Sequence, residues 1–341
     1  MKKEYIIPIF VPHLGCPNDC TFCNQKKISG QKKNISSKDV KDIIEYYLNN
    51  FKESDRKVEV AFFGGSFTGI DRNIQEELLL AANKFIKDGR VDSIRISTRP
   101  DYIDQEVLNL LKKYNVRTIE LGVQSANNYI LNKCKRGHSF EDVKNASKLI
   151  RKNKFQLGHQ MMVGLPESTQ KDEIETAKKL IKLRPKMVRI YPVLVIKDTQ
   201  LAEDYMNNEY KPNTLEQAVE TSAILLEMFN KKKIDVIRIG LQSTDEICNP
   251  KNENSQVVAG PYHPAFRQLV ESRICYDRFS KQIGRLNNKV KAIKVLVNSN
   301  IINNFVGHKR ENIKKIKEIY DIDIIVEIDD SVKDYVIRQV V

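Results

Sequence analysis

Three cysteines lie close together near the start of the sequence, in the stretch VPHLGCPNDCTFCNQ (residues 11–25). Cys16, Cys20 and Cys23 fall at spacings of four and three residues, whereas the other three cysteines of the 341-residue chain are scattered. A loop rich in Gly, Pro and Asn can wrap such thiolates around one centre. In a reducing compartment, clustered cysteines more often bind metal than form disulfides. The stretch therefore predicts a metal site.

The number of ligands separates the possible metals. A tetrahedral zinc site has four ligands, and iron-sulfur proteins commonly supply four cysteines. Three cysteines would leave one iron of a four-iron cluster open to an external ligand. His13 could instead complete a zinc site, although the C-x3-C-x2-C spacing departs from the paired C-x2-C spacing of zinc proteins. A remote fourth cysteine ligand is a further alternative, but single buried cysteines are the commoner interpretation of Cys134, Cys248 and Cys275.

The composition is that of a globular protein with a basic surface. Hydrophobic residues make up 41% of the chain, which is enough for a substantial core. Lys and Arg number 57 against 44 Asp and Glu, and the net charge of +13 favours a nucleic acid or another phosphate-rich partner. The apolar run at the N-terminus is too short for a signal peptide, and no window approaches the roughly 20 apolar residues of a membrane span. We expect a cytoplasmic protein with no membrane partner.

Short β-branched or aromatic runs alternate with amphipathic helical patterns. The expected strands are residues 5–10, 58–64, 93–98, 118–123, 155–163, 187–195 and 235–241. The expected helices are 38–50, 72–87, 104–113, 140–152, 169–183 and 213–232, with a surface loop at 243–256. Repeated strand–helix units imply parallel strands and favour an α/β fold, a partial TIM-type (β/α)6 barrel. Reactive groups should lie at the C-terminal ends of its strands, where the cysteine loop begins.

Two motifs resemble those of one family. The sequence CPNDCTFC, with Phe22 before its last cysteine, resembles the signature of radical S-adenosylmethionine (SAM) enzymes, and AFFGGSFTGI (61–70) stands where that family has a glycine-rich turn. The resemblance implies that Cys16, Cys20 and Cys23 bind a 4Fe-4S cluster whose fourth iron is chelated by the amino and carboxylate groups of SAM. It also implies SAM cleavage to a 5'-deoxyadenosyl radical, driven by a low-potential electron donor such as flavodoxin or ferredoxin.

Four more motifs narrow the resemblance. ISTRPDYI (96–103), ELGVQSANNYIL (120–131), KRGHS (135–139) and RIYPVLVIKDTQL (189–201) resemble the radical-SAM half of Elongator's catalytic subunit and its shorter bacterial relatives. This resemblance implies a SAM pocket at the strand ends formed by Gly64, Gly65, Ser66, Arg99, Gln124 and Ser125. The alternatives are a structural ion pair for Arg99 and helix capping for Gln124 and Ser125. No catalytic residue follows from the resemblance.

The chain departs from Elongator's catalytic subunit after about residue 245. We expect no acetyltransferase domain and hence no acetyl-CoA chemistry. The segment 257–279, VVAGPYHPAFRQLVESRICYDRF, instead resembles the shorter bacterial relatives. His263 and Arg267, on one face of an expected helix start, could bind phosphate or a carboxylate of the substrate. The alternative is a packing helix with Phe266, Leu269 and Val270 inward, and we expect both roles together.

The segment 285–341 reads as a separate basic module. Strand 291–297, a short helix from Ser299, the loop GHKR (307–310), helix 311–320 and strands 321–328 and 334–341 follow an order similar to a KH module, whose GXXG loop clamps an RNA backbone. Between residues 285 and 317 there are nine Lys or Arg and one acid. The RNA-binding candidates are Lys309, Lys314, Lys317 and Arg310, which replaces the second glycine of the motif. A solvated basic face on a packing domain is the alternative.

These patterns predict three parts of the chain and three hypotheses for its function. The parts are a radical SAM partial barrel (1–245), a barrel extension (246–284) and a KH-like basic domain (285–341). The first hypothesis is a radical SAM enzyme that modifies RNA, with a tRNA base as the target. The second keeps the enzyme but gives it a small nucleotide or modified base as substrate. The third is a non-enzymatic iron-sulfur protein that binds RNA.

Overall fold

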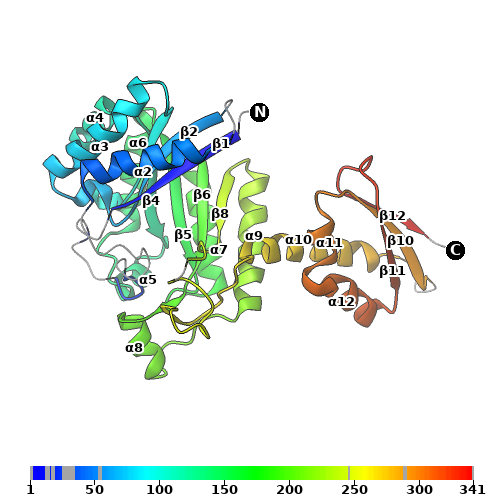
Figure 1. Cartoon of the computed structure of the whole chain (residues 1–341). Coiled ribbons are helices and arrows are strands. Elements are labelled where there is room, and N and C mark those ends of the chain that lie inside the picture. The colour runs from blue at the N-terminus through cyan, green and yellow to red at the C-terminus, as the bar shows by residue number, and fades with distance from the viewer. Residues whose placement is uncertain are drawn as a thin grey trace.

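The computed structural model describes residues 3–11, 16, 20–24, 35–52, 56–244, 246–286 and 290–339. Figure 1 shows a large α/β domain joined by the long helix α10 (Phe266–Ile283) to a smaller domain that contains the C-terminal end of the chain. None of the described helices is both long and apolar enough to cross a membrane.

The large domain is built on a curled sheet of seven strands in the order β1-β2-β3-β4-β5-β6-β8 (Figure 1). Every neighbouring pair is parallel. The strands are β1 (Lys3–Val11), β2 (Arg56–Gly64), β3 (Ser93–Thr98), β4 (Val116–Gln124), β5 (Gln156–Val163), β6 (Met187–Pro192) and β8 (Asp235–Ile239). All seven expected strands are present, and the partial-barrel prediction is confirmed.

The six expected helices connect these strands. They are α2 (Ser37–Asn50), α3 (Arg72–Lys87), α4 (Gln105–Lys113), α6 (Phe140–Lys152), α7 (Gln170–Lys182) and α9 (Leu215–Lys231). Four of them begin at a capping box, in which a Ser or Thr side chain and the acid or amide three residues later satisfy each other's backbone N–H groups; the capping residues are Ser36, Ser139, Thr169 and Thr214. The short helices α5 (Asn128–Lys133) and α8 (Gln200–Met206) were not predicted from the sequence.

The expected strand 187–195 ends earlier than predicted. The run 187–195 ends as a sheet strand at Pro192, which lacks a backbone N–H for the ladder. The next residues form β7 (Val195–Ile196), which pairs instead with β9 (Val257–Ala259) in a separate antiparallel ribbon. The chain therefore leaves the barrel three residues earlier than its β-branched composition indicates.

The two faces of the large sheet differ. On β1, Ile7 and Ile9 are buried in the main hydrophobic core together with Val40 and Ile44 of α2, so this is the face that the helices cover. Because side chains alternate along a strand, Ile6 and Phe10 point to the opposite, concave face, where they are 40% and 37% exposed. The concave face is therefore the interior of a half-open barrel.

The smaller domain has its own sheet and core. Its strands lie in the order β11-β10-β12, with β10 (Ala292–Val297) parallel to β11 (Asp323–Ile328) and antiparallel to β12 (Tyr335–Gln339). Helices α11 (Ile302–Val306) and α12 (Glu311–Tyr320) flank the short 3-10 turn η3 (His308–Arg310). The predicted element order is thus present.

Helix α10 belongs to both cores. Phe266 and Val270 near its start pack in the barrel core, whereas Phe279 and Ile283 near its end pack in the core of the small domain. The helix begins at Phe266, so His263 lies in the preceding loop, and the prediction that His263 and Arg267 share a helix face is wrong. Pro264 explains the difference, because a residue before proline is disfavoured in the helical region. The inward positions of Phe266, Leu269 and Val270 are confirmed.

Candidate active site

Cys16 lies at the C-terminal edge of the barrel sheet, among residues from other strand ends. The backbone N–H of Ser66 donates to its thiol. Burial raises the pKa of Cys16, opposed by this hydrogen bond and by the positive charges of Arg136 and Arg99. Ser66 itself is buried, shares a hydrogen bond with Thr98 at 2.8 Å and accepts one from the Arg99 N–H at 3.2 Å. The structure thus brings together three of the residues that the sequence predicted separately.

Arg136 is a site residue that sequence patterns did not predict. Its guanidinium Nη1 donates to Cys20 Sγ at 3.2 Å and its Nη2 donates to the Gly122 carbonyl at 2.9 Å. The side chain is buried. The available signal was its place in the motif KRGHS, but the sequence does not show that α5 folds this motif back against the cysteine loop. A buried cation is thereby fixed against a predicted metal ligand.

Arg99 is a second buried cation beside the cysteines. Its Nε and Nη2 donate to both carboxylate oxygens of Asp101 at 3.0 and 2.8 Å, as in the predicted ion-pair alternative. Its Nη1 is buried and has no hydrogen-bond partner among the described residues. Because buried donors are rarely left unpaired, this atom suits a bound group with acceptor oxygens or sulfur.

The protein's own backbone explains why glycine occupies the turn after β2. Gly64 has a φ of +111°, and a Cβ there would lie 2.4 Å from the Val11 carbonyl oxygen on the neighbouring strand. The Gly65 N–H donates to that same carbonyl at 3.3 Å. The turn therefore fixes the end of β2 against the start of the cysteine loop, and a glycine is required at position 64 even before a ligand is considered.

Gln124 and Ser125 follow β4 and take different roles. Gln124 has a φ of 66°, and its side-chain Oε1 is buried without a hydrogen-bond partner in the described part of the chain. Ser125 is buried and its hydroxyl accepts from the Asn127 N–H at 3.1 Å, while Asn127 is the residue that caps α5. Ser125 thus shapes the turn before the helix, and Gln124 keeps an open acceptor near the site.

The cysteine loop rests on an apolar layer that includes a fourth cysteine. Cys20 and Phe22 pack with Cys134, and the Thr21 N–H donates to the Cys134 carbonyl at 3.2 Å. Burial raises the pKa of Cys134 to about 12. Cys248 and Cys275 lie elsewhere, in the loop before β9 and on α10. His13, the alternative zinc ligand, lies outside the described residues.

These residues fit a thiolate-bound cluster with a carboxylate-bearing cosubstrate. The thiols of Cys16 and Cys20 lie with the guanidinium groups of Arg99 and Arg136 at one edge of the barrel. There, Arg99 Nη1 and Gln124 Oε1 have no hydrogen-bond partner in the described part of the chain. Among the described residues, no three His, Cys, Asp or Glu side chains converge as the ligands of a single metal ion. In a four-iron cluster, by contrast, each cysteine binds a different iron atom.

A network of charges fills the concave face below this site. Glu120 of β4 accepts hydrogen bonds from Arg189 of β6 at 2.6 and 3.0 Å and from Arg95 of β3 at 2.7 Å. Arg95 also pairs with Glu59 at 2.6 Å, and Gln160 donates to Glu120 at 3.1 Å. Burial disfavours the charged form of Glu120, but the two arginines outweigh it and hold its pKa below the ordinary value. The network closes the interior with paired, fixed charges.

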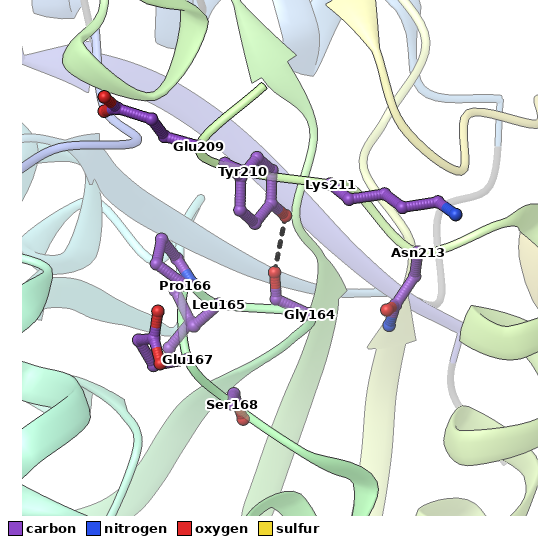
Figure 2. Close-up of a pocket in the computed structure, with 9 residues that line it drawn as sticks. All are labelled: Gly164, Leu165, Pro166, Glu167, Ser168, Glu209, Tyr210, Lys211 and Asn213. Carbon is purple, nitrogen blue, oxygen red and sulfur yellow. Dashed lines mark hydrogen bonds between the residues drawn. The ribbon is translucent and has the colours of Figure 1, made fainter. Parts of the chain in front are cut away.

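A pocket of about 180 Å³ opens beside the end of β5 and is lined by none of the predicted site residues. Figure 2 shows the hydrogen bond that Tyr210 donates to the Gly164 carbonyl, with Ser168 and Asn213 among the lining residues. The bond is 2.6 Å long. The Gly164 N–H donates to the buried Glu173 of α7 at 2.6 Å. Burial raises the pKa of Glu173 to about 7. Both backbone polar groups of Gly164 are thus hydrogen-bonded to side chains.

Comparison with protein families gives two matches. Residues 10–180 match the Radical SAM superfamily, and residues 185–275 match the Radical SAM C-terminal domain. The chain belongs to the radical SAM superfamily. It is therefore a radical SAM enzyme, with a 4Fe-4S cluster and SAM as its cofactors.

This radical SAM enzyme is similar to proteins of the Elongator type. It is 40% identical over 138 residues to a tRNA uridine(34) acetyltransferase of Methanocaldococcus infernus, which covers 38% of this chain and 25% of the relative. It is 26% identical over 201 residues to Elongator complex protein 3 of Saccharomyces cerevisiae, covering 53% and 36%. The structure of Methanocaldococcus infernus Elp3 superposes with a TM-score of 0.62 at 22% identity, over 86% of this chain and 66% of that one. The chain thus spans about a quarter to a third of the length of these curated relatives, and it shares the fold of the Methanocaldococcus infernus structure.

The second candidate site of this radical SAM enzyme lies where the small domain meets the barrel. His308 of the GHKR loop contacts His263, with ring centroids 5.8 Å apart. Burial lowers the pKa of His263, and the neighbouring His308 lowers it further. Arg267 donates to Glu271 at 2.8 Å and to the Val236 carbonyl at 2.8 Å, so its charge is partly satisfied inside the protein. The two groups of RNA-binding candidates are therefore adjacent.

The GHKR loop keeps the backbone form of its glycine motif. Gly307 has a φ of 78°, and a Cβ there would lie 2.9 Å from the buried Asn312 side chain, whose amide also donates to three backbone carbonyls. Arg310 adopts the left-handed conformation, with a φ of 61°, at the position where the motif has its second glycine. The loop thus keeps a glycine-like path while presenting a guanidinium.

The basic candidates of the small domain fall into two groups. Lys309, Arg310 and Lys314 are exposed and have no ion pair or hydrogen bond to their side chains within the described residues. Lys315 is alike in both respects. Lys317 instead pairs with Asp321 at 3.2 Å and with Asp323 at 3.0 Å. The uncompensated positive charge therefore lies at the GHKR loop and the first turns of α12.

Proposed function

We propose that this radical SAM enzyme modifies a base of an RNA, with tRNA as the substrate class. The observation that carries the proposal is the group of exposed, unpaired basic side chains on a glycine-like loop that packs against the barrel at His263. The names of its relatives support tRNA, since one is a tRNA uridine(34) acetyltransferase. The proposal includes three parts of the chain: the radical SAM partial barrel (1–245), the barrel extension (246–284) and the KH-like domain (285–341). It also includes a flavodoxin- or ferredoxin-type electron donor and a cytoplasmic location.

In the barrel, Cys16, Cys20 and Cys23 would hold the cluster, and the groups at the ends of β2, β3 and β4 would hold SAM. When bound and given an electron by the donor, these cofactors would supply a 5'-deoxyadenosyl radical able to abstract a hydrogen atom from the substrate. The chain's own residues orient and shield the site. Arg99 and Arg136 place positive charge beside the thiolates, and the apolar layer of Phe22 and its neighbours keeps water from their outer side.

In the small domain, the GHKR loop would grip the RNA backbone. Positive side chains that contact phosphates position an RNA and carry little base information. Because His308 of the loop contacts His263 just before α10, an RNA held there would lie next to the segment that joins the two domains. Recognition and chemistry would thus be joined through α10.

The test compares Lys309→Glu/Arg310→Glu with wild type in filter binding to tRNA at several salt concentrations. The double variant should bind all tRNAs more weakly, and the slope of log affinity against log salt should fall by about one unit for each phosphate that the variant no longer neutralises. A control, Lys144→Glu/Lys178→Glu, makes the same change in net charge at two exposed lysines that are paired with Glu141 and Glu175. It should bind as wild type does.

A third protein separates the two domains. Cys20→Ala should lose the iron-sulfur cluster, measured as iron and sulfide content, and still bind tRNA. If Lys309→Glu/Arg310→Glu binds tRNA with unchanged affinity and slope, the RNA proposal fails and a small nucleotide substrate takes its place. If RNA binds but the reconstituted wild type never cleaves SAM, the non-enzymatic hypothesis is favoured.

A further inference from the structure

Two aromatic side chains lie side by side on the concave face of the barrel. Phe10 of β1 and Phe63 of β2 are register partners, and their ring centroids are 6.4 Å apart at an interplanar angle of 48°. Phe10 is 37% exposed, which is unusual for an aromatic residue inside a barrel strand. We name Phe10 and Phe63 the aromatic shelf.

A contact across the barrel places the shelf in its interior. The guanidinium of Arg189 lies over the ring of Phe63 at 5.1 Å from the centroid. Arg189 is on β6, and three strands separate β6 from β2 in the sheet. The two side chains can meet only because the sheet curls and both point to the concave face. The cation–π contact fixes the Phe63 ring from one side.

The charged network forms a floor next to the shelf. Arg189 is held by Glu120, and Gln160 donates to both Glu120 and Ser97 at 3.1 Å. These groups satisfy one another, so they close the interior instead of offering free charges. The shelf is the exposed apolar surface above them.

The shelf also adjoins the predicted cofactor site. Phe10 and Phe63 directly precede Val11 and Gly64, the residues that pair at the glycine turn. Beyond that turn, the Ser66 N–H donates to Cys16. A group resting on the shelf would therefore lie at the mouth where the radical chemistry is expected.

We propose that the aromatic shelf stacks the target base of the substrate, extruded from its RNA strand. This inference rests on the proposed function and names the residues that hold the base. Bases stack on aromatic rings and arginine planes whatever their sequence, and enzymes that act on a base commonly take it out of the stack into a pocket. The GHKR loop would hold the backbone while the shelf receives the base.

The experiment uses reconstituted enzyme and tRNA transcripts that contain 5-bromouridine, which crosslinks to nearby aromatic side chains under light. Mass spectrometry should find crosslinks at Phe10 or Phe63. Phe10→Leu and Phe63→Leu should lower the kcat/KM of RNA-dependent deoxyadenosine formation about 5- to 150-fold, the range expected when one base–aromatic stack is removed. Phe10→Tyr keeps the ring and should retain most of the wild-type activity.

Tyr46→Leu is the matched control, because Tyr46 is a 66% exposed aromatic residue on α2, on the opposite face of the sheet. It should behave as wild type. Iron content and melting temperature show that each variant is folded. Crosslinks confined to the small domain, with Phe10→Leu and Phe63→Leu as active as wild type, would overturn the shelf and leave the proposed function standing.

A second probe tests the shelf in case the wild-type protein does not bind tRNA, an outcome that would also defeat the proposed function. The probe is 2-aminopurine riboside, a nucleoside whose fluorescence is quenched by stacking. Quenching by wild type and Phe10→Tyr but not by Phe10→Leu would support a shelf for a small nucleoside. Equal fluorescence with all three proteins would overturn it.

Discussion

The barrel and the small domain differ in how their charged side chains are paired. In the barrel, Glu120 is buried and bonded to two arginines, and every bond lies between 2.6 and 3.0 Å. In the small domain, Lys309, Arg310 and Lys314 are exposed, with no partner for their side chains in the described residues. Charges that are satisfied internally fix a shape, whereas charges left open attract an external ion of opposite sign. The barrel therefore supplies a rigid site and the small domain supplies attraction.

The largest effect should follow from breaking a buried pair. Glu120→Gln keeps the shape but leaves Arg95 and Arg189 with less negative charge in a buried place, and should cost about 3–5 kcal/mol of unfolding free energy. Glu45→Gln is the control, because Glu45 makes an equally bidentate pair with Arg90, at 2.9 and 2.9 Å, on the surface. It should cost about 0–1 kcal/mol. Urea unfolding measures both, and equal losses of stability would show that burial does not separate the two kinds of charge.

A buried acid with no cationic partner among the described residues gives a smaller effect that depends on pH. Glu173 accepts from the Gly164 N–H, and burial raises its pKa from 4.5 to about 7. Since the folded state holds the proton more tightly, stability is full below pH 4.5, falls as the pH rises, and is level above about 7. Glu173→Gln removes this titration. Between pH 5 and pH 8, its free energy of unfolding should therefore rise relative to that of wild type by up to about 3 kcal/mol. Urea unfolding at pH 5 and at pH 8 measures the difference in stability between the variant and wild type. The same difference at both pH values would contradict a buried, titrating Glu173.

The sequence predicted elements better than it predicted contacts between them. Hydrophobic periodicity and capping signals gave the helix Arg72–Lys87 and the strand Ser93–Thr98 to the residue. Periodicity also separates the two faces of a strand. It does not say which face becomes the concave interior, so it could not show that Phe63 meets Arg189.

The same limit applies at the site. The spacing of the cysteines and the two adjacent glycines drew attention to residues that lie within one short segment each. Arg136 escaped notice because its contact with Cys20 joins residues 116 positions apart and depends on how α5 folds back. Likewise, the helical pattern around residues 263–267 predicted that His263 lies on the helix. The effect of Pro264 on the residue before it outweighs that pattern. Local chemistry is readable from sequence, whereas the partner across the fold is not.

The smallest effect sharpens the comparison within a single helix. Lys314 and Lys317 are both exposed on α12, but Lys317 is paired with Asp321 and Asp323, and Lys314 has no side-chain partner in the described part of the chain. Lys314→Ala should lower the salt slope of tRNA binding by about one unit, because an open charge can release counterions from a phosphate. Lys317→Ala should change the slope less, because its charge would first have to leave two carboxylates. Filter binding at several salt concentrations compares the two variants at the same change in net charge. Equal changes in slope would mean that internal pairing does not withdraw a lysine from RNA, and the distinction between open and satisfied charges would then fail on this surface.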